Sequence, residues 1–97
     1  MSISISTHVL DAGQGRPASG VTVELYRGDE LLRAADTDED GRIARLQDGL
    51  DPGLYRLVFH PSSPFLRRVE LGIELDAGHY HVPLLLSPYA CTIYRGS

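Results

Sequence analysis

The sequence lacks lysine, asparagine and tryptophan, and it contains one cysteine and one methionine among 97 residues. All nine basic residues are therefore arginines. Without lysine, the protein cannot use a lysine Schiff base or a lysine general base. The single cysteine, Cys91, cannot form a disulfide within the chain, which fits a reducing compartment. We interpret Cys91 as a small apolar residue, because no general base stands beside it in the sequence.

Positive charge and long apolar runs are also scarce. The 13 acidic residues outnumber the arginines and give a net charge of -4, so neither nucleic acid nor an anionic membrane is an expected partner. No apolar run approaches the roughly 20 residues that span a bilayer. The first residues, MSISISTHVLD, do not resemble a secretory signal, and the last ones do not resemble a retention signal. We therefore expect a cytoplasmic protein.

The sequence does contain short segments in which polar and apolar residues alternate, with turn-forming stretches about every ten residues. In the first segment Ile3, Ile5 and Val9 share one face, and His8 lies on the other. The expected strands cover residues 3–10, 21–27, 31–37, 42–46, 54–59, 69–75, 79–87 and 90–96. This pattern predicts a single all-β domain, a sandwich or a barrel, over residues 1–97. Pro83 indicates an edge strand, a bulge or a position where its missing N–H does no harm.

Two histidines open the expected strand at 79–87. His79 and His81 share one face of it, and Tyr80 lies on the other. With His8 or His60 as a third ligand they could bind zinc. Hydrogen-bonded surface histidines are the commoner result of this spacing, so both interpretations stay open at this point.

The acidic segment DTDEDG copies the first half of an EF-hand calcium loop. The twelfth position of that loop would be Gln47 rather than the glutamate that calcium needs, and no helices are predicted beside it. The simpler interpretation is an acidic β-turn in which Gly41 supplies a positive φ. Arg42 follows directly, either as a cation that offsets the carboxylates of the turn or as a site residue.

His8 and His81 both lie on strand faces that are partly apolar. Leu10 shares its face with His8, and Pro83 and Leu85 share theirs with His81. Apolar faces of this kind are often covered by another subunit. A titratable side chain in a covered cleft is a candidate for function.

Two blocks near the ends of the sequence, STHVLDAGQGRPASGVTVELYR and HYHVPLLLSPYACTIYRGS, flank DEDGR and GLYRLVF. Together they resemble the transthyretin-like family of 5-hydroxyisourate hydrolases. The resemblance implies a sandwich of two four-stranded sheets, and a homotetramer (a dimer of dimers) with active sites at the dimer–dimer interface. It also implies hydrolysis of 5-hydroxyisourate, formed by urate oxidation in purine degradation, to 2-oxo-4-hydroxy-4-carboxy-5-ureidoimidazoline, without metal or cofactor. The alternative is a non-catalytic small-ligand-binding protein of the transthyretin type.

The same resemblance implies roles for individual residues. The histidine of THVLD is His8, the arginine of DGR is Arg42, and the second histidine of HYHVP is His81. Either histidine could be the general base, and Arg42 would stabilise the oxyanion. The implied catalytic residues are His8, Arg42, His81, Tyr94 and Ser97, and the implied substrate-binding residues are His8, Arg42, Tyr94 and Arg95. His79 receives no role.

In this family the last strand delivers its end into the active site, and the first, fourth, seventh and eighth strands form the sheet that lines it. Gly96 is expected to allow a backbone turn there that other residues would resist. The chain departs from the family at HPSSPFLRR, which is shorter than the usual helix-containing connection. Pro61 and Pro64 oppose a helix in this segment. Cys91 also replaces a more usual tyrosine.

Overall fold

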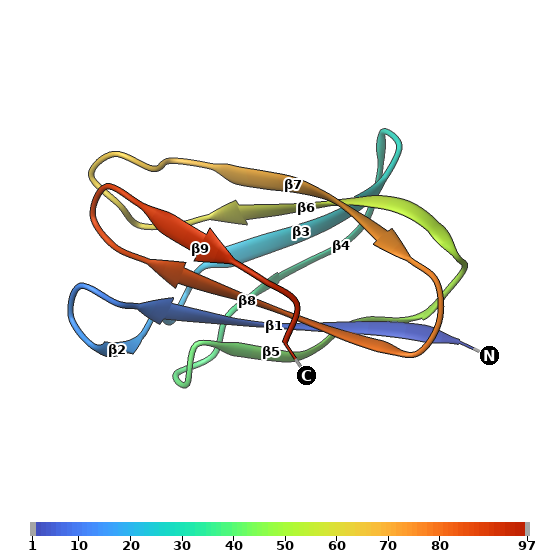
Figure 1. Ribbon diagram of the computed structural model, residues 1–97, viewed down its shortest axis with the longest axis horizontal. Helices are drawn as coiled ribbons and strands as arrows, with labels where there is room; N and C mark the ends of the chain where they lie inside the picture. The colour runs from blue at the N-terminus through green and yellow to red at the C-terminus, as the bar shows by residue number, and fades with distance from the viewer. Residues whose placement is uncertain (1, 97) are drawn as a thin grey trace.

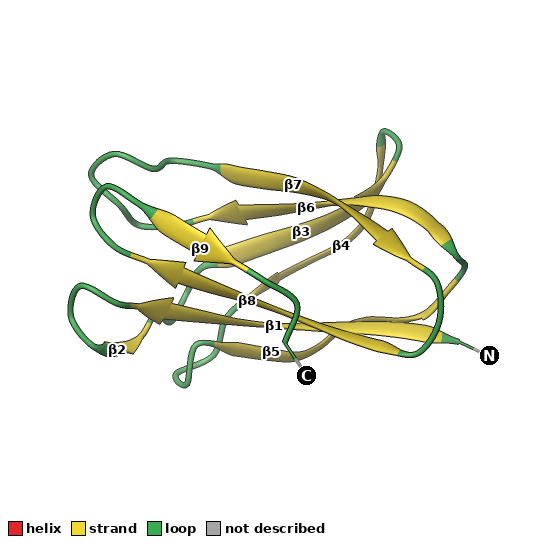
Figure 2. Ribbon diagram, in the orientation of Figure 1, coloured by secondary structure: helices red, strands yellow, loops and turns green. Residues whose placement is uncertain are grey.

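The computed structural model describes residues 2–96, and within this range the protein consists of nine β-strands without a helix (Figures 1 and 2). The strands are β1 (Ile3–Asp11), β2 (Arg16–Pro17), β3 (Thr22–Arg27), β4 (Glu30–Asp36), β5 (Arg42–Leu50), β6 (Gly53–His60), β7 (Val69–Leu75), β8 (His79–Leu86) and β9 (Cys91–Ile93). Eight of them correspond to the predicted strands. The additional strand, β2, is a two-residue pairing within the connection that follows β1.

The strands form the two layers of a sandwich. One sheet has the order β2-β1-β8-β9, and β5 pairs with β1 on the edge that β2 also uses. The other sheet has the order β4-β3-β6-β7. Strands β1 and β8 are parallel, whereas every other pair is antiparallel. The predicted all-β sandwich is thus confirmed, except that the two-residue β2 makes one of the two expected four-stranded sheets five-stranded, and the predicted first, fourth, seventh and eighth strands do share that sheet.

The alternation of the sequence determines which side chains face the core. In β1, Ile3, Ile5 and Val9 are fully buried, and Leu25 and Phe59 meet them from the second sheet. Burying an aliphatic or aromatic side chain of this size contributes about 1.5–3 kcal/mol. The opposite face of β1 is thereby left for other functions.

The strand β5 is longer than the sequence predicts. It continues through the segment DGL, expected to be a loop, because Leu50 pairs with Ile3 and is itself buried. Two register shifts between β1 and β5 accompany this pairing. Alternation did not reveal the extension, since irregular pairing breaks the period of two.

The last strand, in contrast, is shorter than the predicted 90–96. The ladder that pairs Leu84 with Ile93, and His81 with Gly96, would place Tyr94 opposite Pro83. Proline has no N–H to donate at that position, and β9 ends at Ile93. Pro83 therefore lies in a central strand, at a point where the neighbouring strand has already left the ladder.

The connection between β6 and β7 contains no helix, as its length and prolines predict. Ser63 organises it instead. The Ser63 hydroxyl accepts hydrogen bonds from the N–H groups of Phe65 and Leu66 and donates one to the carbonyl of Pro88. Among residues 2–96 there is no helix long and apolar enough to cross a membrane.

Candidate active site

The outer face of the sheet that contains β1, β5 and β8 brings three of the predicted site residues together. His8 of β1 pairs with Arg42 of β5 on one side and with Pro83 of β8 on the other. His81 lies two residues before Pro83, on the same face. The centroids of the His8 and His81 rings are 6.5 Å apart, and the rings are tilted by 41°. Residues separated by as many as 73 positions in the sequence thus share one small surface.

The acidic turn before β5 fixes His8. The Nε2 atom of His8 lies 3.0 Å from the carbonyl oxygen of Asp40. A carbonyl can only accept, so Nε2 carries a proton, and Nδ1 is the ring nitrogen left for another partner. Gly41 has a φ of 75°, as the sequence predicts, and a Cβ there would lie 2.4 Å from the carbonyl oxygen of Val9. The tight turn therefore holds Asp40 against His8.

The carboxylate of Asp38 stabilises the same turn. Its Oδ1 atom accepts hydrogen bonds from the backbone N–H groups of Asp40 and Arg42, each 2.9 Å long. The Arg42 side chain is exposed and takes part in none of the ion pairs found within residues 2–96. Its guanidinium group is therefore available at the site, and the turn carboxylate is occupied by backbone groups.

His81 is half-buried and has a lowered pKa. Burial is the main cause, and the positive charges of His8, Arg42 and His79 add to it, so that the pKa lies below its ordinary value of 6.5. The Nδ1 atom of His81 lies 2.7 Å from the hydroxyl of Ser6. The remaining nitrogen, Nε2, is left for water or substrate. At neutral pH this imidazole is a neutral proton acceptor.

His79, which received no role in the sequence analysis, is joined to His81 through Ser6. Its Nε2 atom lies 2.8 Å from the Ser6 hydroxyl, and its Nδ1 atom lies 2.6 Å from that of Ser4. Sequence analysis missed both serines, although they alternate with His8 on one face of β1. That alternation was the available signal.

The alternative of a zinc site with His60 as a ligand is wrong. His60 belongs to β6 in the other sheet, and its Nε2 atom lies 2.6 Å from a carboxylate oxygen of Glu24. In residues 2–96, no three histidine, cysteine, aspartate or glutamate side chains come together in an arrangement that could hold a metal ion.

The C-terminal segment returns to the site at Gly96. Its N–H donates a 2.7 Å hydrogen bond to the carbonyl of His81. The expected special backbone turn at Gly96 is wrong, because its φ is not in the left-handed region. Close approach explains the glycine instead, since a Cβ there would lie 2.8 Å from Cδ2 of His81. Ser97, a predicted catalytic residue, lies outside the described residues.

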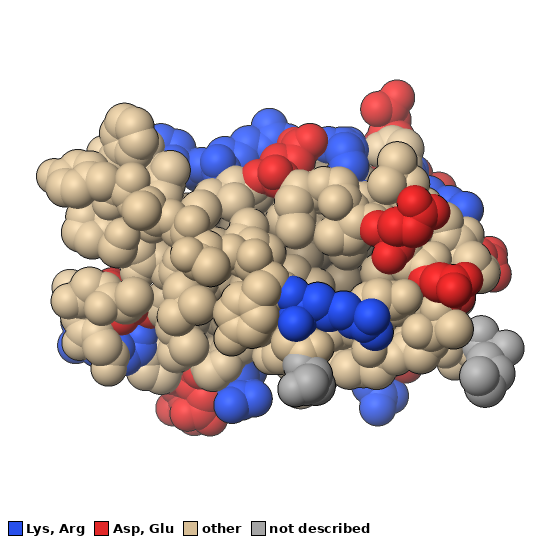
Figure 3. Space-filling model, in the orientation of Figure 1, with Lys and Arg blue, Asp and Glu red and all other residues tan. Residues whose placement is uncertain are grey.

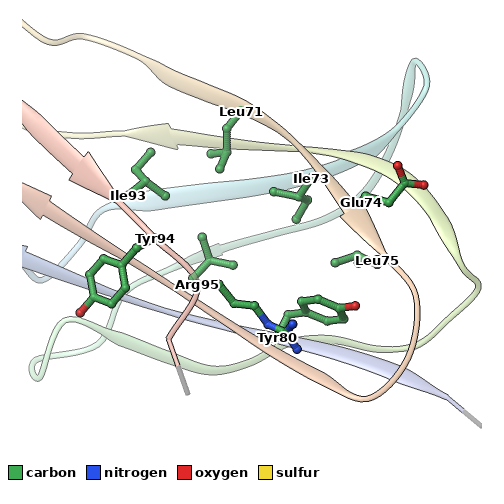
Figure 4. A pocket seen from close by; sticks show the side chains of 9 residues that line it. Leu71, Ile73, Glu74, Leu75, Tyr80, Ile93, Tyr94 and Arg95 are labelled. Carbon is green, nitrogen blue, oxygen red and sulfur yellow. The ribbon is translucent and has the colours of Figure 1, made fainter.

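The other two residues of the predicted C-terminal set are Arg95 and Tyr94, which directly precede Gly96. The Arg95 guanidinium carbon is 4.0 Å from the centroid of the Tyr80 ring (Figure 4). Tyr80 alternates with His79 and His81 along β8, so this contact is on the opposite face of the strand. Tyr94 is 50% exposed at the end of β9.

Tyr80 and Arg95 border a cavity of about 330 Å³ between the sheet edges formed by β7 and β9 (Figure 4). Apolar residues form most of its wall: Leu71, Ile73, Leu75, Val82 and Ile93. Figure 3 shows that charged side chains gather along the β7 edge, whereas uncharged residues form the surface over β9. His8 and His81 are not among the residues that line this cavity, and its polar wall is formed by Glu74, Tyr80, Tyr94 and Arg95.

The sequence model of the HIUase/Transthyretin family matches residues 5–96. The protein belongs to this family.

Individual relatives have more specific names. The chain is 45% identical to "5-hydroxyisourate hydrolase 2" of Rhizobium meliloti, and the match covers 96% of this chain and 95% of the relative. Its fold is similar to the structure of Klebsiella pneumoniae 5-hydroxyisourate hydrolase, with a TM-score of 0.89, 36% identity and coverage of 97% and 98%. The chain is also 39% identical to "5-hydroxyisourate hydrolase" of Halalkalibacterium halodurans, and the match covers both chains completely. That alignment is 119 positions long, whereas this chain has 97 residues. The alignment therefore leaves gaps in this chain opposite residues of that relative.

Proposed function

We propose that this protein hydrolyses 5-hydroxyisourate to 2-oxo-4-hydroxy-4-carboxy-5-ureidoimidazoline. One observation carries the proposal: His8, Arg42 and His81, which match the family motifs, come from three strands to one face of the sheet. Relatives that bear the name of this enzyme match nearly the full length of the chain. The domain extends over residues 1–97.

Hydrolysis of a cyclic amide needs a base that takes a proton from water as the water attacks the carbonyl carbon. His81 fits this role because its pKa is lowered and its Nε2 atom makes no hydrogen bond to residues 2–96. General-base catalysis by a positioned histidine typically contributes about 10²–10⁴-fold. The proton is then available for the ring nitrogen that leaves when the C–N bond breaks.

Negative charge develops on the carbonyl oxygen during the attack. Arg42 is the cation next to both histidines, and its planar guanidinium group can donate two parallel hydrogen bonds to an oxyanion or a flat anionic ring. His8 orients the substrate from the other side through Nδ1, because its Nε2 atom is already bonded to the Asp40 carbonyl.

The C-terminal residues complete the site in this proposal. Tyr94 would orient the substrate, and Ser97 remains a predicted catalytic residue. Arg95 can bind substrate only if it leaves its contact with Tyr80. The hydrogen bond from the Gly96 N–H to the His81 carbonyl supports a role of this segment at the site.

We also propose a homotetramer with the site at its dimer–dimer interface. The predicted apolar patch of Leu10, Pro83 and Leu85 supports it less than expected, because Pro83 is buried and the two leucines are half-buried within one chain. The open cavity between the edge strands β7 and β9 provides further apolar surface that association would cover. A cytoplasmic location stays a prediction from the sequence.

The direct test is to mix the purified protein with urate and urate oxidase and to follow the decay of the hydroxyisourate absorbance. We expect faster decay than without the protein, and the same rate with EDTA. Binding of a urate analogue without faster decay would favour the non-catalytic, transthyretin-type alternative. Loss of activity with EDTA, restored by zinc, would contradict the metal-independent mechanism.

A further inference from the structure

Four side chains on the outer face of the sheet form a continuous line of hydrogen bonds. Ser4 lies 2.6 Å from Nδ1 of His79, and Ser6 lies 2.8 Å from Nε2 of the same ring. The Ser6 hydroxyl also lies 2.7 Å from Nδ1 of His81. We call Ser4, His79, Ser6 and His81 the serine–histidine network.

The network follows from the register of the two parallel strands. Ser4 of β1 is the partner of His79 of β8, and Ser6 is the partner of His81. Alternate residues point to the same face, so hydroxyls and imidazoles interleave along the strand pair. Ser6 is buried, His81 is half-buried, and His79 is exposed. The line therefore runs from the proposed reacting imidazole to solvent.

Every member of the network can both donate and accept a hydrogen bond. In one orientation His81 donates from Nδ1 to Ser6, and its Nε2 atom is an unprotonated base. In the other orientation Ser6 donates to Nδ1 of His81, and Nε2 carries a proton and can act as an acid. Reversing all the hydrogen bonds converts the base form of His81 into its acid form without a net charge on the ring.

We propose that His79 and Ser6 are positioning residues that conduct protons between His81 and solvent and switch His81 between its base and acid forms. The inference rests on the proposed hydrolysis and adds two residues to its machinery. It names a function for His79, the histidine that the sequence left unassigned.

The proton transfers along the network balance over one catalytic cycle. His81 takes a proton from the attacking water at Nε2, and its Nδ1 proton passes to Ser6. The hydroxyl proton of Ser6 passes to Nε2 of His79, and the Nδ1 proton of His79 passes to Ser4, which releases its own proton to bulk water. When Nε2 of His81 protonates the leaving nitrogen, one proton returns along the same path and the network is reset.

The surroundings leave the network free to conduct. At its solvent end, Arg45 and Asp48 of β5 line the same groove as Ser4 and His79, but they pair with each other at 3.2 Å. Both ring nitrogens of His79 are bonded to serines, so within residues 2–96 neither of them is bonded to a carboxylate. At the other end, the charges of His8 and Arg42 act on His81, and that of His79 acts on it from within the network.

The kinetic test compares His79→Leu, His79→Gln and Ser6→Ala with the wild type, and uses His60→Leu as the matched control on the other sheet. We expect the first three variants to lose about tenfold or more in kcat with little change in KM, since assisted proton transfer typically contributes 10²–10⁴-fold. The control keeps wild-type kinetics. Ser6→Thr retains a hydroxyl and should recover most of the kcat that Ser6→Ala loses. If His79→Gln, which can hold Ser6 but cannot relay a proton, is fully active, conduction is refuted.

A second readout does not depend on turnover. Two-bond ¹H–¹⁵N spectra of the wild-type protein should show neutral His81 averaging between its two tautomers, and His79→Leu or Ser6→Ala should shift it to one. An unchanged His81 tautomer in both variants would overturn the proposal even if the enzyme is active. Absence of hydroxyisourate hydrolysis by the wild type, with the tautomer shift present, would instead refute the proposed function and leave the network standing.

Discussion

The two sheets of the sandwich each contain a histidine with an orderly hydrogen-bond environment, but the two environments are opposite. On the second sheet, His60 is bonded to Glu24, and Arg56 and Arg68 both pair with Glu70. On the first sheet, His81 has a hydroxyl as its partner, and the charges that act on it are positive.

The two environments shift the pKa of different groups: the carboxylate on the second sheet and the imidazole on the first. On the second sheet the hydrogen bond from His60 is the main cause that lowers the pKa of Glu24. On the first sheet burial and neighbouring cations lower the pKa of His81 itself. Pairing with a carboxylate favours a charged imidazole, whereas burial among cations favours a neutral one. The comparison teaches that burial among positive charges, rather than pairing with a carboxylate as in His60, makes His81 suitable as a base.

Replacing His8 should have the largest effect. We expect His8→Gln to lower kcat/KM by about 100-fold or more, because the substrate loses a positioned group within the catalytic set. The fold should persist, since His8 lies on the outer face of β1. Steady-state kinetics and a melting curve measure the two properties. If His8→Gln also lowers the melting temperature substantially, the loss of activity would follow from a weakened fold, and His8 would be a structural residue.

Arg42→Gln tests whether positive charge near His81 supports catalysis and lowers the pKa of that imidazole. Loss of an oxyanion donor typically costs about 10²–10³-fold in kcat. Removing this positive charge should also raise the pKa of His81. Since the neutral imidazole is the base, the acid limb of the kcat/KM profile should move to higher pH. An acid limb that stays in place would show that His81 is not the group that titrates.

Gly96→Ala tests the close approach of the C-terminal segment. The new methyl group would lie 2.8 Å from Cδ2 of His81, so the ring or the segment must move. We expect a loss of about tenfold in kcat, because small displacements of catalytic groups are costly. Gly72→Ala is the matched control, since its Cβ would come no closer than 4.0 Å to Leu54. Equal activity of the two variants would show that the close approach at Gly96 is not needed for catalysis.

Glu24→Gln should have the smallest effect and should concern stability alone. Partly exposed ion pairs contribute less than about 1 kcal/mol. Because the pKa of Glu24 is lowered, its contribution is present above the ordinary value of 4.5 and is lost as the pH falls through the lowered value. Urea unfolding at neutral and acidic pH measures this. A change in kcat would show that the second sheet takes part in the site.

The extent to which the sequence predicted the site differs between residues. His8, Arg42 and His81 were found because the motifs that contain them are specific, and strand pairing then brought them together. Ser4 and Ser6 were missed, because their partners depend on the register between β1 and β8. The alternating pattern determines which face a residue occupies but not which residue lies opposite it.

Two features of the fold show the same limit of prediction from the sequence. The early end of β9 depends on Pro83 standing opposite Tyr94, and the sequence alone does not reveal that pairing. The need for glycine at Gly96 was foreseen, but its reason was not, because close approach to His81 is a tertiary contact. In contrast, the positive φ of Gly41 is a local property of the turn and was predicted correctly.

The most direct test of the account is the turnover of hydroxyisourate by His81→Gln and His60→Gln, measured beside the wild type. Each variant removes one histidine, one from each sheet. We predict that His81→Gln loses about 100-fold or more in kcat/KM, as expected for loss of a general base, while His60→Gln retains the wild-type value. An active His81→Gln variant, or an equal loss in His60→Gln, would contradict the assignment of the active site to the outer face of the first sheet.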